Sequence, residues 1–226
     1  MSTDLPIPPS PQNSERIGID ESGKGDYFGP LVIAAAFVSP QIERDLRLME
    51  VRDSKRISDG RVHELARDIR QVCKCSIVAI GPERYNELHA KIGNLNRLLA
   101  WGHARALENL LEQVDAKVAI ADQFGDERYI SNALLERGKQ VHLIQRPKAE
   151  EDVAVAAASI LARAEFLVRL KRLSEQVGTS LPKGASHSVE LAARMVLKKH
   201  GEEALRTVAK IHFKTTKAVR SGMEGA

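Results

Sequence analysis

The sequence predicts an α/β fold in which a mixed β-sheet is flanked by helices and followed by a helical C-terminal region. Two apolar strand segments, 16–20 and 31–38, lie close together and are separated by a polar, glycine-rich turn. Beyond them, helical and strand patterns alternate, which is typical of strands joined by crossover helices. From about residue 178 onward, the hydrophobic spacing is helical only.

Hydrophobic spacing sets the remaining elements in order. Apolar residues recur every three or four positions across 61–72 and 94–114, and Asn94 is suited to cap the second helix. Between these helices, 75–80 predicts a strand. The later predicted elements are strands at 117–121 and 141–144, helices at 127–137 and 153–177, a loop at 178–186, and helices at 188–200 and 202–210. Small side chains at 154–158 allow the long helix to pack closely on a sheet.

The chain shows no repeat and no linker, so we expect one domain spanning 16–218, with its helical part at about 178–218. Residues 1–15 are rich in Pro and Ser and predict a disordered leader, and 219–226 a short tail.

Composition excludes several classes of protein. The 226 residues are 43% hydrophobic, which is ordinary for a globular chain. No segment reaches the ~20 apolar residues of a membrane span, and the N-terminus lacks the pattern of a secretory signal. Cys73 and Cys75 are too few for a disulfide framework. We therefore expect a cytoplasmic protein with reduced thiols and no membrane partner.

Positive charge is concentrated in the C-terminal third. Residues 163–226 contain 13 Lys or Arg and 6 Asp or Glu, whereas the rest contains 21 and 24. A region that binds a polyanion would have this excess of positive charge. A solvated helical surface would also have it, and charge alone favours neither interpretation.

Acidic residues follow two predicted strands. Asp20 and Asp122 each come directly after an apolar strand core, where α/β folds place their ligand sites. A third acidic group, 150–152, opens the long helix. If these acids converge, their oxygens suit Mg²⁺ or Mn²⁺, and a pair of such ions suits phosphodiester hydrolysis. The basic, glycine-spaced loop 22–25 beside Asp20 predicts a neighbouring phosphate site.

Each acidic group also has a structural interpretation. Asp20 and Glu21 could begin a turn, Asp122 could cap a helix, and acids 150–152 are common at helix starts. Neighbours on a strand point to opposite faces, so we expect Asp20 and Glu21 to share a site only where the strand ends or bulges. Tyr27 and Phe28 either pack beneath the loop or touch the minor groove of a nucleic acid.

Six blocks in order resemble the type 2 ribonucleases H, and more specifically ribonuclease HIII, over about 16–218. They are DESGKGDYFGPLV (20–32), DSK (53–55), the strand ending at Asp122, KAEEDVAVAAASILAR (148–163), LPKGAS (181–186) and IHFKTTKA (211–218). The resemblance implies a ribonuclease H-like fold. It also implies metal-dependent hydrolysis of the RNA strand of RNA/DNA hybrids, with 5′-phosphate and 3′-hydroxyl products.

The resemblance further implies a four-carboxylate site that binds Mg²⁺ or Mn²⁺. Its members would be Asp20, Glu21, Asp122 and Glu150, with Glu151 as the alternative fourth acid. The implied substrate-binding residues are Ser22, Gly23, Lys24, Gly25, Asp53, Ser54, Lys55, Lys148 and Lys183. For Lys148 and Lys183, a solvated surface position is at least as well supported.

Two departures from the family pattern qualify this expectation. Only about 15 residues precede the first strand, so we expect the usual N-terminal substrate-binding domain to be absent. Ribonuclease HII uses a loop tyrosine to recognise an RNA–DNA junction, but Leu181-Pro182 stands here. We expect an enzyme that cuts hybrids, and we expect it to be a monomer. The alternatives are an enzyme that also incises at single ribonucleotides and a hybrid-binding protein without catalysis.

Overall fold

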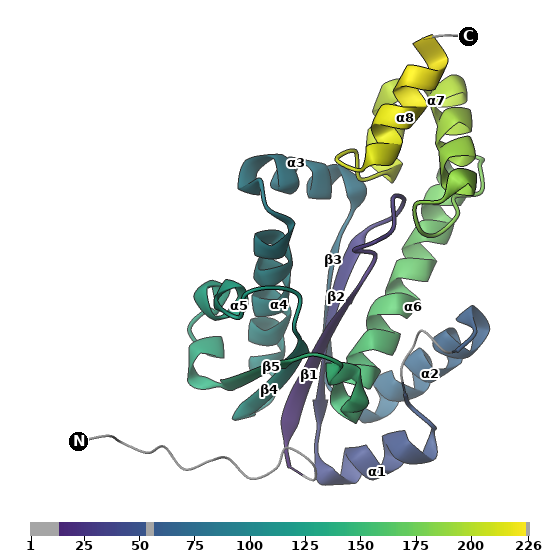
Figure 1. The fold of residues 1–226 in the computed structure, drawn as a ribbon. Coiled ribbons are helices and arrows are strands. Elements are labelled where there is room, and N and C mark those ends of the chain that lie inside the picture. Colours follow the sequence, from purple (N-terminus) through teal and green to yellow (C-terminus); the bar gives the residue numbers. More distant parts are fainter. Residues whose placement is uncertain (1–13, 53–56, 225–226) are drawn as a thin grey trace.

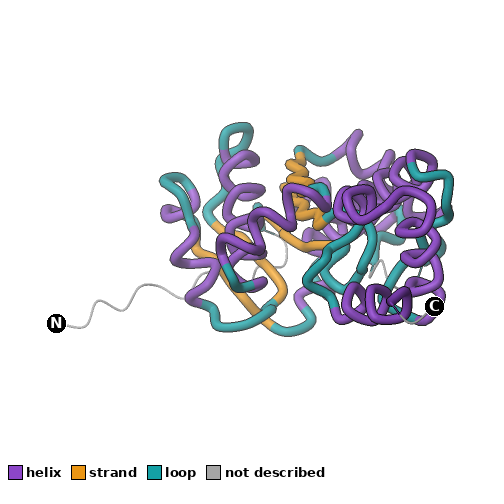
Figure 2. Tube along the Cα trace, turned by 90° about the horizontal axis from the view of Figure 1, so that it is seen from above, coloured by secondary structure: helices purple, strands orange, loops and turns teal. Residues whose placement is uncertain are grey.

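The computed structural model describes residues 14–52 and 57–224, which form a five-stranded sheet between helical layers (Figures 1 and 2). The strands are β1 (Arg16–Ser22), β2 (Leu31–Val38), β3 (Cys75–Ile80), β4 (Val118–Asp122) and β5 (His142–Arg146). Their order is β3-β2-β1-β4-β5. The pairs β3–β2 and β2–β1 are antiparallel, whereas β1–β4 and β4–β5 are parallel. The predicted mixed α/β sheet is confirmed.

Helices cover both faces of this sheet (Figure 1). The helices are α1 (Pro40–Leu48), α2 (Asp59–Val72), α3 (Pro82–Ile92), α4 (Leu95–Leu111), α5 (Arg128–Ala133), α6 (Val153–Gln176), α7 (His187–Val208) and α8 (Lys214–Glu224), with short 3₁₀ turns η2 (Gly138–Gln140) and η3 (Ala149–Glu151). One face packs against α6, with α1 and α2 beside it, and the other packs against α4. Among the helices of the described residues, none has the length and apolar character needed to cross a bilayer.

Side-chain alternation divides the core into two layers. On β2, Val32 and Ala34 belong to the layer beneath α6, whereas Leu31 and Ile33 belong to the layer beneath α4. On β1, Gly18 faces α6 so closely that a Cβ atom there would lie 2.1 Å from the backbone of Ala154. Glycine on the strand and small residues on α6 thus bring that helix directly onto the sheet.

The predicted elements differ from the structure at a few places. The first strand runs to Ser22 rather than ending at residue 20. By contrast, the two helices predicted at 188–200 and 202–210 are confirmed as the two halves of α7, which meet at the non-helical backbone of Gly201 (φ 79°). Helices α1 and α3 were not predicted, and α8 continues to Glu224 through the expected tail. The predicted leader lies almost entirely outside the described residues.

Candidate active site

Asp20 and Asp122 lie side by side on adjacent parallel strands, at the last residue of β4 and two residues before the end of β1. Ile19 on β1 pairs with Ala121 on β4, so the next residues along the two strands are the two aspartates. Two residues before each aspartate, Gly18 and Ile120 face α6, so alternation along the strands places both aspartates on that face. Ser159 of α6 donates a hydrogen bond to Asp20. The two aspartates line one open cavity of about 440 Å³. The structure therefore brings together two acids that are about a hundred residues apart in sequence.

Glu21 reaches the same cavity from the opposite face of β1. It pairs with Ile33 in an unbroken ladder that continues to Ser22, so the strand neither ends nor bulges between the two acids. The expectation that sharing a site requires a strand end or bulge was therefore wrong. The cavity lies at the end of the sheet formed by the C-terminal residues of β1 and β4, where side chains from both faces can reach it.

The surroundings of Asp20 and Glu21 shift the pKa values of their side chains in opposite directions. Burial, followed by the nearby charges of Glu21 and Asp122, raises the pKa of Asp20 to about 7 from 3.8. Burial also acts to raise the pKa of Glu21, but the hydrogen bond from His103 and the charge of Lys24 outweigh it, so this pKa is lowered. The crowded carboxylates favour a cation in the cavity because it would relieve their mutual repulsion.

The donor set fits a hard divalent cation that keeps part of its water shell. Among the described residues, no three His, Cys, Asp or Glu side chains converge closely enough to hold an ion by themselves. Mg²⁺ is commonly held by one or two carboxylates, with water and substrate phosphate completing its shell. Asp20, Asp122 and Glu21 around an open cavity match this mode of binding.

The acidic group 150–152 divides into different roles. Asp152 is buried, caps α6 through the backbone N–H of Ala154 (2.8 Å), and forms an ion pair with Arg16 (2.9 Å). Asp152 is thus the N-cap of α6, which agrees with the interpretation of 150–152 as acids at a helix start. Glu150 is half-buried and Glu151 is exposed.

The turn that carries Glu150 touches Asp122, because the N–H of Ala149 donates to Asp122 Oδ1 at 3.3 Å. However, Glu150 and Glu151 both line a neighbouring hollow, together with Lys148, rather than the cavity of Asp20. Only three of the four predicted acids therefore share one cavity.

The basic loop lines the cavity along its whole length, 22–25. Gly23 has a φ of +90°, and a Cβ atom there would lie 2.1 Å from the carbonyl oxygen of Pro30. Gly25 has no atom of the chain near its Cβ position. Lys24 Nζ lies 3.7 Å from Glu21 Oε1 and 5.4 Å from the ring centre of Phe124. The fold thus requires the first glycine, while the second leaves open space beside the acids.

Residues of the C-terminal region form hydrogen bonds with the segment that directly follows the basic loop. Lys210 is fully buried, and its ammonium donates to the carbonyl oxygens of Asp26 and Gly29, each at 2.7 Å. The carboxylate of Asp26 accepts from the N–H of Gly184 at 2.7 Å. Tyr27 and Phe28 are fully buried, so of the two sequence interpretations packing beneath the loop is correct and contact with a minor groove is wrong.

Two further cations border the cavity and share one carboxylate. Arg163 of α6 and Lys183 both pair with Asp59 at the start of α2, at 2.6 and 2.7 Å. Sequence reasoning selected Lys183 but not Arg163, because their juxtaposition depends on tertiary packing. Asp53, Ser54 and Lys55, which the resemblance implicates, lie outside the described residues.

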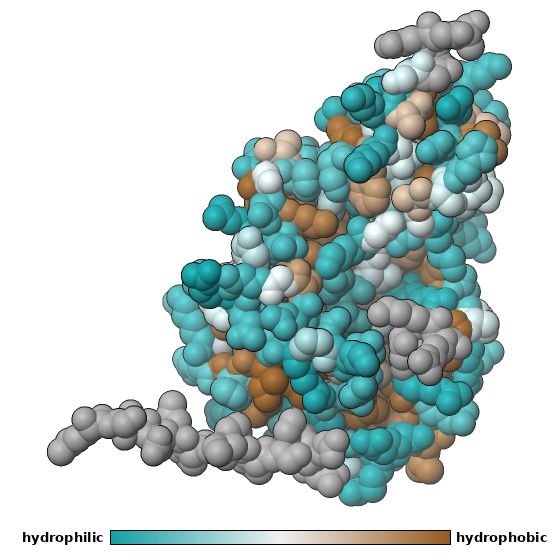
Figure 3. All heavy atoms as spheres, viewed as in Figure 1, coloured by the Kyte–Doolittle hydropathy of each residue, from teal (hydrophilic) through white to brown (hydrophobic). Residues whose placement is uncertain are grey.

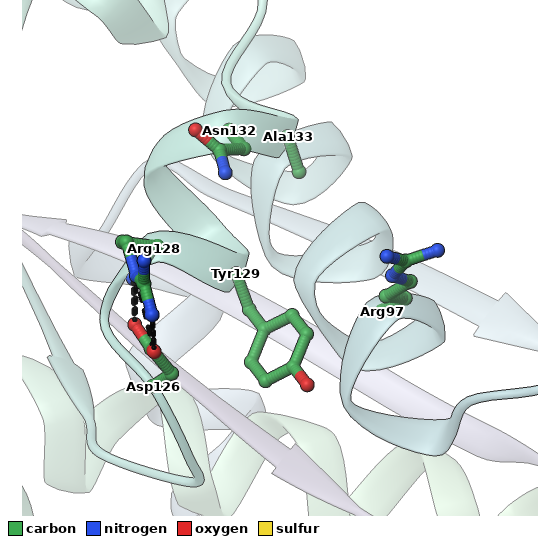
Figure 4. Close-up of a pocket in the computed structure, with 6 residues that line it drawn as sticks. All are labelled: Arg97, Asp126, Arg128, Tyr129, Asn132 and Ala133. Atoms are coloured by element: carbon green, nitrogen blue, oxygen red, sulfur yellow. Dashed lines mark hydrogen bonds and ion pairs between the residues drawn. The ribbon is translucent and has the colours of Figure 1, made fainter.

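A third hollow lies between α4 and α5 (Figure 4). Tyr129 and Arg97 border it, and Asp126 pairs with Arg128 at 2.6 Å. It shares no lining residue with the carboxylate cavity and contains none of the candidate acids. We therefore place the candidate active site at the carboxylate cavity.

Comparison with known proteins shows the family of the chain. A family model described as Ribonuclease HII matches residues 17–216. The chain belongs to the ribonuclease HII family. It is therefore a ribonuclease H, a hydrolase of the nuclease class, as predicted.

Several relatives within this family bear the name ribonuclease HIII. The chain is 47% identical over 203 residues to ribonuclease HIII of Protochlamydia amoebophila, covering 90% of this chain and 67% of the relative. It is 47% identical over 210 residues to ribonuclease HIII of Chlamydia pneumoniae, covering 92% and 70%. A solved structure of Bst-RNase HIII in complex with Mn²⁺ is 34% identical, with a TM-score of 0.87, and the match covers 95% of this chain and 71% of that one.

Proposed function

We propose that this ribonuclease H hydrolyses the RNA strand of RNA/DNA hybrids with the help of Mg²⁺ or Mn²⁺. The proposed products carry 5′-phosphate and 3′-hydroxyl ends. The observation that carries the proposal is the placement of Asp20 and Asp122 on one face of adjacent strand ends, beside a basic loop. The Mn²⁺ complex of the similar Bst-RNase HIII supports the choice of cofactor.

Each acid then has a distinct task. Asp20 and Asp122 hold divalent cations from the α6 face, and Glu21 holds them from the α4 face. Glu150 completes the set from the turn beside Asp122. When bound, divalent cations would neutralise charge on the phosphate and activate a water for hydrolysis of the phosphodiester by two metal ions.

The basic loop is the proposed contact with the hybrid. Ser22 and Lys24 are suited to phosphate contact, and Gly25 has free space around it for the substrate backbone to approach. A 2′-hydroxyl group read at this loop would distinguish RNA from DNA. Lys183 and Lys148 extend the contact along the strand, and Asp53, Ser54 and Lys55 are proposed to flank it.

Continuous hybrids are the proposed substrate rather than single embedded ribonucleotides. Leu181 occupies the position of the junction-recognising tyrosine, and its side chain is buried in the core. Its backbone N–H donates to Ser174 Oγ (3.1 Å), which fixes the loop on α6. This position therefore offers no hydroxyl or aromatic ring to a junction.

Cleavage of two end-labelled duplexes in Mg²⁺ and in Mn²⁺ tests this proposal. One duplex is a continuous RNA/DNA hybrid, and the other is DNA with a single ribonucleotide. We expect cutting of the hybrid alone, with products that carry a 5′-phosphate. Cutting of both would favour the broader specificity of an enzyme that incises at single ribonucleotides. Cutting of neither would contradict the proposed function.

A further inference from the structure

His103 is a buried polar residue on the apolar face of α4. Its side chain has no exposure to solvent, and it lies among core residues such as Leu99 and Leu107. Its Nε2 atom lies 3.0 Å from Glu21 Oε2. Its Nδ1 atom is buried and has no hydrogen-bond partner in the described part of the chain. A buried nitrogen without a partner costs stability, so packing alone does not explain a histidine here.

The hydrogen-bonding pattern assigns the role of donor to Nε2. Glu21 offers only acceptor oxygens when it is ionised, and Nε2 is the ring nitrogen that faces them. The proton of the ring therefore belongs on the nitrogen that faces the carboxylate. The imidazole ring also packs against the ring of Phe124, with centroids 4.9 Å apart, which restricts its rotation.

The contact leaves the second carboxylate oxygen on the cavity side. Oε2 of Glu21 accepts from His103, whereas Oε1 lies 3.7 Å from Lys24 Nζ, a residue that lines the cavity. Without the imidazole, Glu21 would keep only the longer contact of Oε1 with the half-exposed Lys24, so its side chain would be free to sample other rotamers.

We propose that His103 is a positioning residue that holds Glu21 so that Oε1 is presented to a divalent cation. This inference rests on the proposed metal-dependent function. His103 touches neither substrate nor cation and acts only through Glu21. Hydrogen-bonded supports of this kind commonly contribute 10- to 100-fold to metal affinity.

Calorimetric titration of Mn²⁺ into the protein, without nucleic acid, tests the proposal. The variants are His103→Leu, Glu21→Gln and the double variant, with His200→Leu as the control. His200 also donates through Nε2, but to the carbonyl of Val177 at 2.9 Å, and its lost hydrogen bond is remote from the acids. We expect His103→Leu to weaken Mn²⁺ binding by at least about tenfold. We also expect the double variant to bind Mn²⁺ no more weakly than Glu21→Gln, since both changes remove the same interaction.

Binding by His103→Leu within twofold of the unsubstituted protein would overturn the proposal, and so would additive losses in the double variant. If His103→Leu does not fold, His103→Met provides the test, because its side chain fills the site but has no hydrogen-bond donor. It is expected to weaken Mn²⁺ binding by at least about tenfold as well, and unchanged affinity would overturn the proposal. If the unsubstituted protein binds Mn²⁺ but fails to cut hybrids, the proposed function fails while the Mn²⁺ data still decide the role of His103.

Discussion

At the scale of single residues, the acids of the site could be predicted from the sequence. Some of the residues that contact or border them could not. Asp20 and Asp122 were predictable because each directly follows an apolar strand core. His103 was missed, although its position four residues after Leu99 and four before Leu107 places it on the predicted apolar stripe. A histidine on that stripe was the available signal. The pairing of Arg163 with Asp59 had none, because it depends on how α2 packs beside α6.

The raised pKa of Asp20 predicts a pH dependence of stability. Between its ordinary value of 3.8 and about 7, folded Asp20 retains a proton that the unfolded chain has released. Folding therefore takes up protons in this range, and this group's contribution to the free energy of unfolding falls as pH rises. Urea unfolding in EDTA should show this fall between pH 5 and 7, and Asp20→Asn should reduce it. An equal slope in both proteins would contradict the assigned environment.

At the scale of elements, hydrophobic spacing located the sheet better than it located the short helices. The strands at 31–38 and 75–80 have the predicted bounds, and Asn94 caps α4 by accepting the N–H of Arg97 at 3.1 Å. Helices α1 and α3 both begin with proline, which suits a first helical turn but also resembles a loop in sequence. The packing of the C-terminal region against the basic loop was not predictable, because it depends on contacts about 180 residues apart.

Lys210→Met tests this packing. The substitution removes the donor for the carbonyls of Asp26 and Gly29, and leaving these buried groups unpaired costs about 1–3 kcal/mol. We expect lower stability in urea and a higher KM for the hybrid, because the basic loop loses its support. The exposed Lys217→Met is the matched control on α8 and should change neither quantity. A Lys210→Met protein with normal stability and KM would show that the contact does not position the loop.

At the scale of the whole molecule, the fold places the carboxylate cavity at the C-terminal end of β1 and β4. The face seen in Figure 3 is mainly hydrophilic, with its hydrophobic residues in small separate groups. Large exposed hydrophobic side chains in the described chain are scattered over α1, α4 and α7, at Leu48, Trp101, Leu191 and Met195. This surface, together with the basic C-terminal third, suits a charged polymer better than an apolar partner.

The central claim is that Asp20 and Asp122 act together in one hydrolytic site. The most direct measurement is the cleavage rate of an end-labelled RNA/DNA hybrid in Mn²⁺ by the unsubstituted protein, Asp122→Asn and Asp115→Asn. Asp115 is an exposed acid paired with Lys117 away from the cavity, so its loss controls for the removal of a charge. We expect Asp122→Asn to fold normally and to lose at least about 100-fold in rate, equivalent to about 2.7 kcal/mol of barrier. Asp115→Asn should cut normally, and near-normal cleavage by a folded Asp122→Asn protein would contradict the assigned site.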